Sequence, residues 1–335
     1  MAGKDFGIYR EAGGGASLTN TWSDLTFDTN VQQDSGFTRS GGTVTQGDEG
    51  VLLAIYGVGA EENGGGAACV RLDLQQDTGS GFGGVKGGRA YTSFDDSDGV
   101  DAGQAFGVTM IDGSASDDYK LRARTQISGE TADEAANRTS LQLLQIPQDF
   151  DVCILSESSN DSNIGSGFGY LTWDTTDRID TASFSTASNG GIQAKTAGRY
   201  MLVYNVCFEL DDNPSGTAEG CMFHVVATLN ATVGGASVSE RINHTFRRKT
   251  APHFATPSTA ANVALVCFVD LAANDVVRLH RRYLNKGTST DQVNVLGSQS
   301  VFAMVRIDDA TPSHGAIELR RTSTVTGWTG SQVID

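Results

Sequence analysis

The sequence predicts an all-β protein built from two similar domains, each a sandwich of antiparallel strands. The first observation is an internal repeat that covers most of the chain. The second is composition: 41 of 335 residues are glycine while 39% are hydrophobic, so the apolar residues must lie in short runs separated by turns. The third is that no segment keeps a helical period for more than two turns.

The repeat consists of three segments that recur in the same order. They are residues 50–58, 115–124 and 139–146 in the first copy, and residues 198–206, 273–282 and 300–307 in the second. The offset grows from 148 residues at the first pair to 158 at the second, so the second copy has longer loops. Two copies of one domain explain this pattern better than one large fold.

The end of the first copy sets the domain boundary. We expect a first domain over residues 1–147, a second over 148–310 and a C-terminal tail over 311–335. A domain of roughly 150 residues is large enough for a core of its own.

Two kinds of strand are expected within each copy. The runs 51–58 and 200–208 are apolar at almost every position, which predicts strands buried on both faces. One face belongs to the core of the domain, and a neighbouring subunit is the simplest cover for the other. Apolar Tyr119, Leu121 and Ala123 alternate instead with charged residues, the pattern of a strand with one wet face.

The charge is strongly acidic and unevenly divided. The formal net charge is -16, and residues 1–148 contain 10 basic against 21 acidic residues, while residues 149–335 contain 14 against 19. Such a surface repels nucleic acids and anionic lipids, so neither is an expected partner. No stretch reaches the roughly 20 apolar residues of a membrane helix, and we expect a protein that is not exported from the cytoplasm where it is made.

Reactive and metal-binding residues give few signals. The five cysteines are odd in number and show no zinc-ligand spacing, so we expect neither an obligatory disulfide nor zinc. Asp96, Asp98 and Asp101 belong to an acidic segment that is either a calcium loop or a solvated loop. His244, His253 and His280 fit no ligand pattern, and surface or core histidines are the simpler explanation.

Catalytic motifs are missing from the sequence. It contains no nucleophile elbow, no zinc-protease motif and no phosphate-binding loop. We therefore expect a non-enzymatic protein that needs no cofactor.

The repeated segments resemble the C1q/TNF-like domain family. The second copy carries the resemblance in a Gly-x-Tyr strand at 198–206, an Asp-terminated loop before a Val-x-Leu strand at 273–279, and a closing strand at 300–304. The tryptophans at 22 and 173 resemble the lead-in of C1q-like domains found in bacteriophage and bacterial proteins. The first copy matches less well, with Val51 and Leu52 where the family prefers an aromatic residue.

The resemblance implies two tandem ten-stranded jelly rolls that assemble as a homotrimer, with apolar side chains of the inner sheets meeting at the three-fold axis. The candidates for this trimer core are Tyr56, Val58, Tyr204, Val206 and Phe302. The alternative is that these residues form the ordinary core of their own domains.

The resemblance also implies a role. We expect a structural virion protein, a decoration or head-fibre protein on a phage capsid, synthesised in the host cytoplasm. The basic clusters are candidates for binding a partner such as capsid protein: Arg247, Arg248, Lys249, Arg281 and Arg282. One alternative is a tail protein that binds a receptor or glycan through Phe254 and Tyr283, and another is a double jelly-roll capsid protein.

Overall fold

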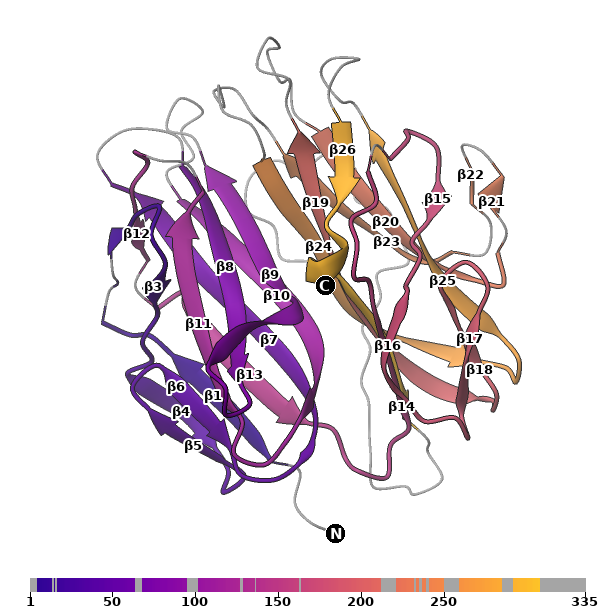
Figure 1. The fold of residues 1–335 in the computed structure, drawn as a ribbon, viewed down its shortest axis with the longest axis horizontal. Coiled ribbons are helices and arrows are strands. Elements are labelled where there is room, and N and C mark those ends of the chain that lie inside the picture. The colour runs from indigo at the N-terminus through magenta and orange to yellow at the C-terminus, as the bar shows by residue number, and fades with distance from the viewer. Residues whose placement is uncertain are drawn as a thin grey trace, which may run out of the picture.

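A computed structural model shows an all-β chain folded into two β-sandwiches, as the sequence predicts (Figure 1). The structure describes residues 5–307 except for 14, 16, 64–67, 95–101, 127–128, 136, 163, 212–220, 232, 235–236, 239–240, 250–258 and 285–291. Among the described residues, no helix is long and apolar enough to span a membrane.

The first sandwich pairs an inner sheet that contains β7 with an outer sheet that contains β8. The inner sheet has the order β2-β12-β7-β13-β1-β4 with β10 also on β7, and the outer sheet has the order β5-β6-β11-β8-β9 with β3 on β11. The inner strands are β1 (Phe6–Arg10), β2 (Ser17–Leu18), β4 (Thr29–Gln33), β7 (Gly50–Glu62), β10 (Ala102–Gly113), β12 (Ala132–Glu134) and β13 (Ser140–Gln145). The outer strands are β3 (Ser23–Asp24), β5 (Phe37–Ser40), β6 (Thr43–Gln46), β8 (Ala68–Asp77), β9 (Phe82–Phe94) and β11 (Asp118–Thr125).

The second sandwich has an inner sheet around β19 and an outer sheet around β20. Their orders are β16-β14-β27-β19-β24 with β26 on β19, and β17-β18-β25-β20-β23 with β15 on β25. The inner strands are β14 (Val152–Ser156), β16 (Thr175–Ile179), β19 (Gly198–Asp211), β24 (Thr259–Leu271), β26 (Gln292–Val295) and β27 (Val301–Ile307). The outer strands are β15 (Gly169–Tyr170), β17 (Phe184–Ala187), β18 (Gly191–Ala194), β20 (Cys221–Leu229), β23 (Arg241–Lys249) and β25 (Val276–Leu284). The hairpin of β21 (Val233–Gly234) and β22 (Ser237–Val238) and the short 3-10 helix η2 (Gly297–Gln299) complete it.

The two sandwiches share one topology, so their positions can be matched through strand pairing. Tyr56 pairs with Leu141 in the first domain as Tyr204 pairs with Phe302 in the second. The order β4-β1-β13-β7-β10 therefore corresponds to β16-β14-β27-β19-β24, which makes the repeat a structural duplication.

Each domain has its own core between its two sheets. The largest fully buried side chains are aromatic and lie mostly on the inner sheets, including Tyr9 and Tyr56 in the first core and Tyr200, Tyr204 and Phe302 in the second. The alternation predicted around Tyr119 is confirmed, because the residues of β11 are alternately half-buried and buried. Strand β11 thus has one face in the core and one that is partly wet.

Candidate functional site at the junction of the two domains

The candidate functional feature of this molecule is the junction between the two domains. Figure 1 shows the sandwiches side by side, with β9 and β10 of the first next to β19 and β24 of the second. Each domain contributes the outward face of its inner sheet, the first through β7 and β10 and the second through β14, β19, β24 and β27, and β9 of the first domain also contacts β19 and β24.

An apolar cluster fills this junction. The first domain supplies Val51, Leu53, Val108, Met110 and Ile146, and the second supplies Val152, Ile154, Met201, Val203, Val301, Ala303 and Val305. All are buried, and those of β7, β19 and β27 alternate with the core residues of the same strands. Area removed from water on both sides stabilises the paired arrangement by roughly 25 cal/mol per Å2.

The junction explains the two runs that the sequence marks as buried on both faces. The second face of β7 and of β19 is covered by the other domain of the same chain, whereas the sequence favoured a neighbouring subunit. The five trimer-core candidates face the cores of their own domains, which is the alternative that the sequence left open. Tyr56 and Val58 lie in the core of the first domain, and Tyr204, Val206 and Phe302 lie in the core of the second.

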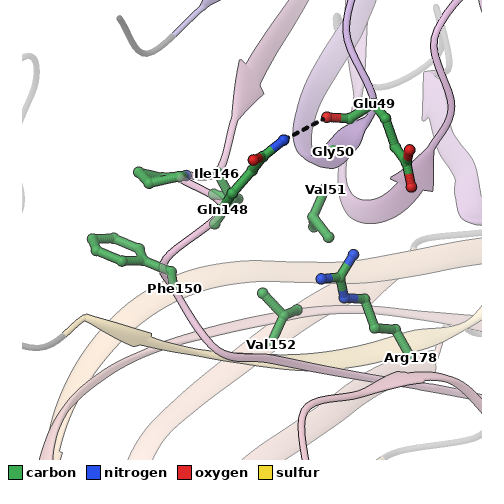
Figure 2. Close-up of a pocket in the computed structure, with 9 residues that line it drawn as sticks. Glu49, Gly50, Val51, Ile146, Gln148, Phe150, Val152 and Arg178 are labelled. Carbon is green, nitrogen blue, oxygen red and sulfur yellow. Dashed lines mark hydrogen bonds between the residues drawn. The ribbon is translucent and has the colours of Figure 1, made fainter. Parts of the chain in front are cut away.

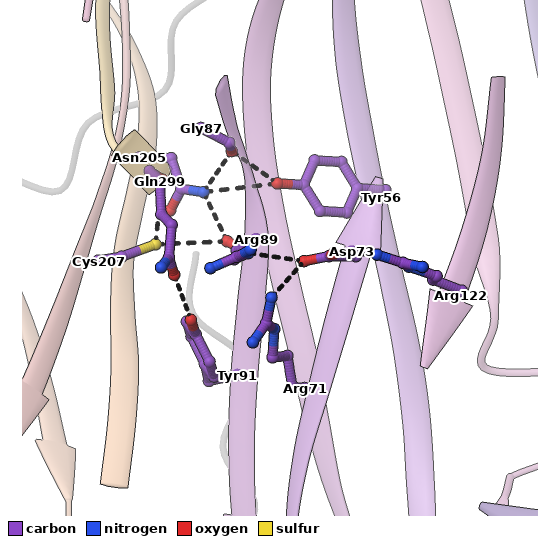
Figure 3. Close-up of polar contacts among 10 residues, drawn as sticks. All are labelled: Tyr56, Arg71, Asp73, Gly87, Arg89, Tyr91, Arg122, Asn205, Cys207 and Gln299. Carbon is purple, nitrogen blue, oxygen red and sulfur yellow. Dashed lines mark hydrogen bonds and ion pairs between the residues drawn. The ribbon is translucent and has the colours of Figure 1, made fainter. Parts of the chain in front are cut away.

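A buried amide anchors the polar part of the junction. The Nδ2 of Asn205 donates to the backbone oxygens of Gly87 at 2.7 Å and Arg89 at 2.8 Å, both on β9 (Figure 3). The hydroxyl of Tyr56 donates to the same Gly87 oxygen at 2.8 Å, so its ring is in the core while its tip reaches the junction. Each of these buried groups would cost stability if it lost its partner.

A second buried amide extends this network. Asn262 on β24 donates to the backbone oxygen of Phe106 at 2.8 Å and to Oδ1 of Asn205 at 2.9 Å. Its own Oδ1 accepts the backbone N–H of Tyr91 at 3.0 Å, and the Tyr91 hydroxyl donates to Gln299 at 2.5 Å. Side chains of the second domain thus satisfy backbone groups of the first.

Close approach at the junction depends on a glycine. Gly87 has a φ of +65° and lies under the side chain of Val301, so a Cβ at this position would collide with Cγ1 of Val301. Glycine meets both requirements, because it adopts positive φ without strain and carries no side chain.

Arginines line the outer-sheet side of the junction. Asp73 is 1% exposed and receives Arg89 at 2.9 Å, Arg122 at 3.2 Å and Arg71 at 3.4 Å. The guanidinium groups of Arg71, Arg122 and Arg124 also lie 4.2–4.8 Å from the ring centre of Trp22, within range of cation–π attraction. The buried carboxylate therefore holds β8, β9 and β11 together behind the edge that contacts the second domain.

The connection between the domains lies over a small pocket. Figure 2 shows Gln148 donating to the backbone oxygen of Glu49, with Val152 and Arg178 of the second domain near Val51 of the first. The volume of this pocket, about 180 Å3, is below the several hundred Å3 typical of sites for drug-sized molecules. It belongs to the connection and offers no substrate cleft.

The chemistry of the junction is that of packing. Burial raises the pKa of the Cys207 thiol to about 12 and raises the pKa of Tyr56 and of Tyr91 well above the ordinary value, so all three stay protonated at neutral pH. A protonated thiol is a poor nucleophile. No group of three or more metal-binding side chains is placed to hold an ion in the part of the chain that the structure describes.

The basic candidates lie on two strands of the second outer sheet, β23 and β25, which both pair with β20. Arg281 pairs with Asp161 at 3.3 Å, and Arg282 donates to His224 and stacks over the ring of Phe168. Arg247, Arg248 and Lys249 end the edge strand β23, and their side chains lie outside the described residues.

The other candidates are placed as follows. His280 is buried and its Nε2 shares a hydrogen bond with Thr228, as expected for a core histidine. Tyr283 is half-buried against the second core. Asp96, Asp98, Asp101, Phe254 and the tail from 311 lie outside the described residues.

Sequence reasoning missed the two asparagines of the junction. Asn205 is the one polar residue between Tyr200 and Phe208, and Asn262 stands in the same way in the apolar run of β24. A lone amide in a doubly buried strand is a signal for a polar contact across the buried face, because an unpaired amide there would be costly.

Comparisons with known proteins give likenesses at low identity. No protein-family model matches the chain, and no curated protein matches it. Murine APRIL at pH 5.0 is 11% identical over 43% of this chain and 100% of its own, with a TM-score of 0.34. Eiger TNF from S. frugiperda is 13% identical over 50% of this chain and 99% of its own, with a TM-score of 0.31.

Proposed function

We propose that the chain is a non-enzymatic structural protein that decorates a larger particle, the head of a tailed bacteriophage. The observation that supports this most is the use of the inner sheets, which serve as packing surfaces between the domains. The buried thiol and phenols at the junction are protonated and hydrogen-bonded, which suits assembly and not chemistry.

Its partners in this role are other copies of itself and the capsid protein, and its location is the virion after synthesis in the host cytoplasm. The net charge of -16 disfavours nucleic acid and anionic membranes as partners. The basic end of β23, with Arg247, Arg248 and Lys249, is the segment we propose for capsid contact, because β23 is the last strand of its sheet.

Immunogold electron microscopy of purified source particles, with an antibody against the chain, tests this role. We expect label on the heads and none on particles assembled without the protein. Label at the tail tip would favour the receptor- or glycan-binding alternative, and absence from all particles would overturn the virion role.

Rebinding to heads that lack the protein tests the contact segment. Replacement of Arg247, Arg248 and Lys249 by alanine should weaken head binding at least tenfold, whereas Lys195→Ala on the loop after β18 should leave it unchanged. Equal binding by both variants would remove the basic segment from the contact.

A further inference from the structure

Another pocket lies at the junction, beside the outer sheet of the first domain. Its polar lining comes from both domains: Arg71, Tyr91, Arg124 and Gln126 of the first, and Glu209 and Gln299 of the second. The volume of about 170 Å3 is below that of sites for drug-sized molecules, while about 10–15 Å3 is enough for one water molecule. The pocket therefore has room for a small ion with its hydrogen-bonding partners.

Two arginines of this pocket have unused hydrogen-bonding capacity. Arg71 lies 3.4 Å from Asp73 and shares this carboxylate with Arg89 and Arg122. Arg124 takes part in no ion pair or hydrogen bond among the described residues. The Nε atoms of Arg71 and Arg124 are both buried without a hydrogen-bond partner in this part of the chain. Buried donors without partners cost stability, so an acceptor bound here would stabilise the folded chain.

The two amide side chains of the pocket add further donors. The Oε1 of Gln126 accepts the thiol of Cys69 at 2.6 Å. The Oε1 of Gln299 accepts the hydroxyl of Tyr91 at 2.5 Å (Figure 3). With its oxygen already engaged, each amide retains its NH2 group, which can only donate.

The charge of the pocket also favours an anion. Arg71 and Arg124 are positive and Glu209 is negative, and Glu209 forms an ion pair with neither arginine among the described residues. Burial lowers the pKa of Arg71, and the positive charges of Arg89 and Arg124 lower it further, while Tyr91 and Asp73 act in the opposite direction. An added negative charge would offset the repulsion between these guanidinium groups.

We propose that this pocket binds a small tetrahedral oxyanion, phosphate or sulfate, between the two domains. The donors come from four separate side chains, Arg71, Arg124, Gln126 and Gln299, and the four oxygens of such an ion can accept from all of them, whereas a carboxylate has only two oxygens. Because Gln299 belongs to the second domain and the other three donors belong to the first, the anion adds a link across the junction. The site requires no capsid, and a failure of the virion role would leave it intact.

Isothermal titration calorimetry of the full chain with sodium phosphate, in chloride buffer of constant ionic strength, tests the proposal. We expect one phosphate per chain with a Kd at or below about 1 mM. Phosphate should also raise the unfolding temperature, because it binds the folded state. Arg124→Gln should weaken binding about tenfold or more and remove most of this rise. Arg10→Gln removes the same charge at an exposed position of β1 and should bind like the wild type.

Two further measurements identify the charge and the shape of the ligand. Glu209→Gln removes the carboxylate of the pocket and should tighten phosphate binding, whereas weaker binding would overturn the proposal, because it would mean that the pocket holds a cation. Sodium acetate should bind about tenfold more weakly than phosphate or less, and equal binding would overturn the assignment to a tetrahedral ion.

The wild-type chain and the arginine variant decide the rest. A wild-type chain that binds no phosphate at about 20 mM would overturn the proposal. So would an Arg124→Gln variant that is folded by circular dichroism and binds phosphate as tightly as the wild type.

Discussion

The inner sheets of the two domains have the same strand order, yet their outward faces differ in what covers them. Val203 in the second domain is fully buried under the first domain, while its counterpart Ile55 is only half-buried. Val301 and Ala303 are replaced by Ser140 and Gln142 on the first-domain face. Both faces contribute to the internal interface, the second-domain face over β14, β19 and β27 and the first-domain face over β7 and β10, so equal folds do not imply equal contacts.

The polar groups of the junction show the same asymmetry. Asn205 and Asn262 of the second domain have Gly57 and Gln104 as their first-domain counterparts, and Gln104 is exposed. The second domain supplies side-chain amides, and the first supplies backbone groups of β9 and β10. The two domains therefore have complementary roles, and exchanging them would leave buried amides without partners.

The largest expected difference between the two faces comes from charge burial. Val203→Asp places a carboxylate without a partner in the junction and should lower the free energy of unfolding by about 4 kcal/mol or more. Ile55→Asp at the matching position should cost about 1–2 kcal/mol, because water reaches that side chain. Urea denaturation followed by circular dichroism measures both. Equal losses would mean that the two faces are equally covered.

A methyl group added at Gly87, where the two domains approach closely, should have the next largest effect on stability. Gly87→Ala forces alanine into positive φ and against Val301, at a cost of about 2–4 kcal/mol. Gly84→Ala on the same strand is the control, because a Cβ there meets nothing within 4 Å. Thermal unfolding of both variants tests this. A small loss for Gly87→Ala would show that the junction opens without effect on stability.

Two glutamates at matching positions of the two domains should respond differently to pH. Burial, aided by Asp161 and Asp174, raises the pKa of Glu157 to about 7, whereas its counterpart Glu11 accepts hydrogen bonds from Thr26 and Gly13. A carboxyl group whose pKa is raised on folding favours the folded state below about pH 4.5, and this stability is lost as the pH rises through 7.

Glu157→Gln should therefore stabilise the protein by up to about 3 kcal/mol at pH 9 and change little at pH 4. Glu11→Gln should destabilise it by about 1 kcal/mol at pH 9, because it weakens two satisfied hydrogen bonds. Denaturant midpoints across this pH range provide the measurement. A Glu157→Gln variant without gain at high pH would contradict the assignment.

The smallest effect is expected from the ion pairs at the rim of the junction. Lys86 lies 2.5 Å from Asp177, and the two side chains are 45% and 24% exposed. Lys86→Met should cost less than about 1 kcal/mol, and 1 M NaCl should abolish the difference from wild type. A larger loss that persists in salt would show that this pair contributes through packing.

The strands and their burial were well predicted where the side chains alternate, and less well where they do not. The run from 200 to 208 predicts a strand buried on both faces, but it does not tell which residues face the core. The aromatic residues suggested an axial role for Tyr56 and Tyr204, and the structure places both in domain cores.

The sequence by itself determined the duplication, the all-β class and the need for cover on both faces of two strands. These properties follow from local patterns: glycine-bounded runs, a period of two, and the recurrence of three segments. Only the tertiary structure decided what supplies that cover and which residues touch it. An unbroken apolar run has no polar side chain to mark its wet face, so the direction of each side chain and the choice of partner depend on contacts between distant segments.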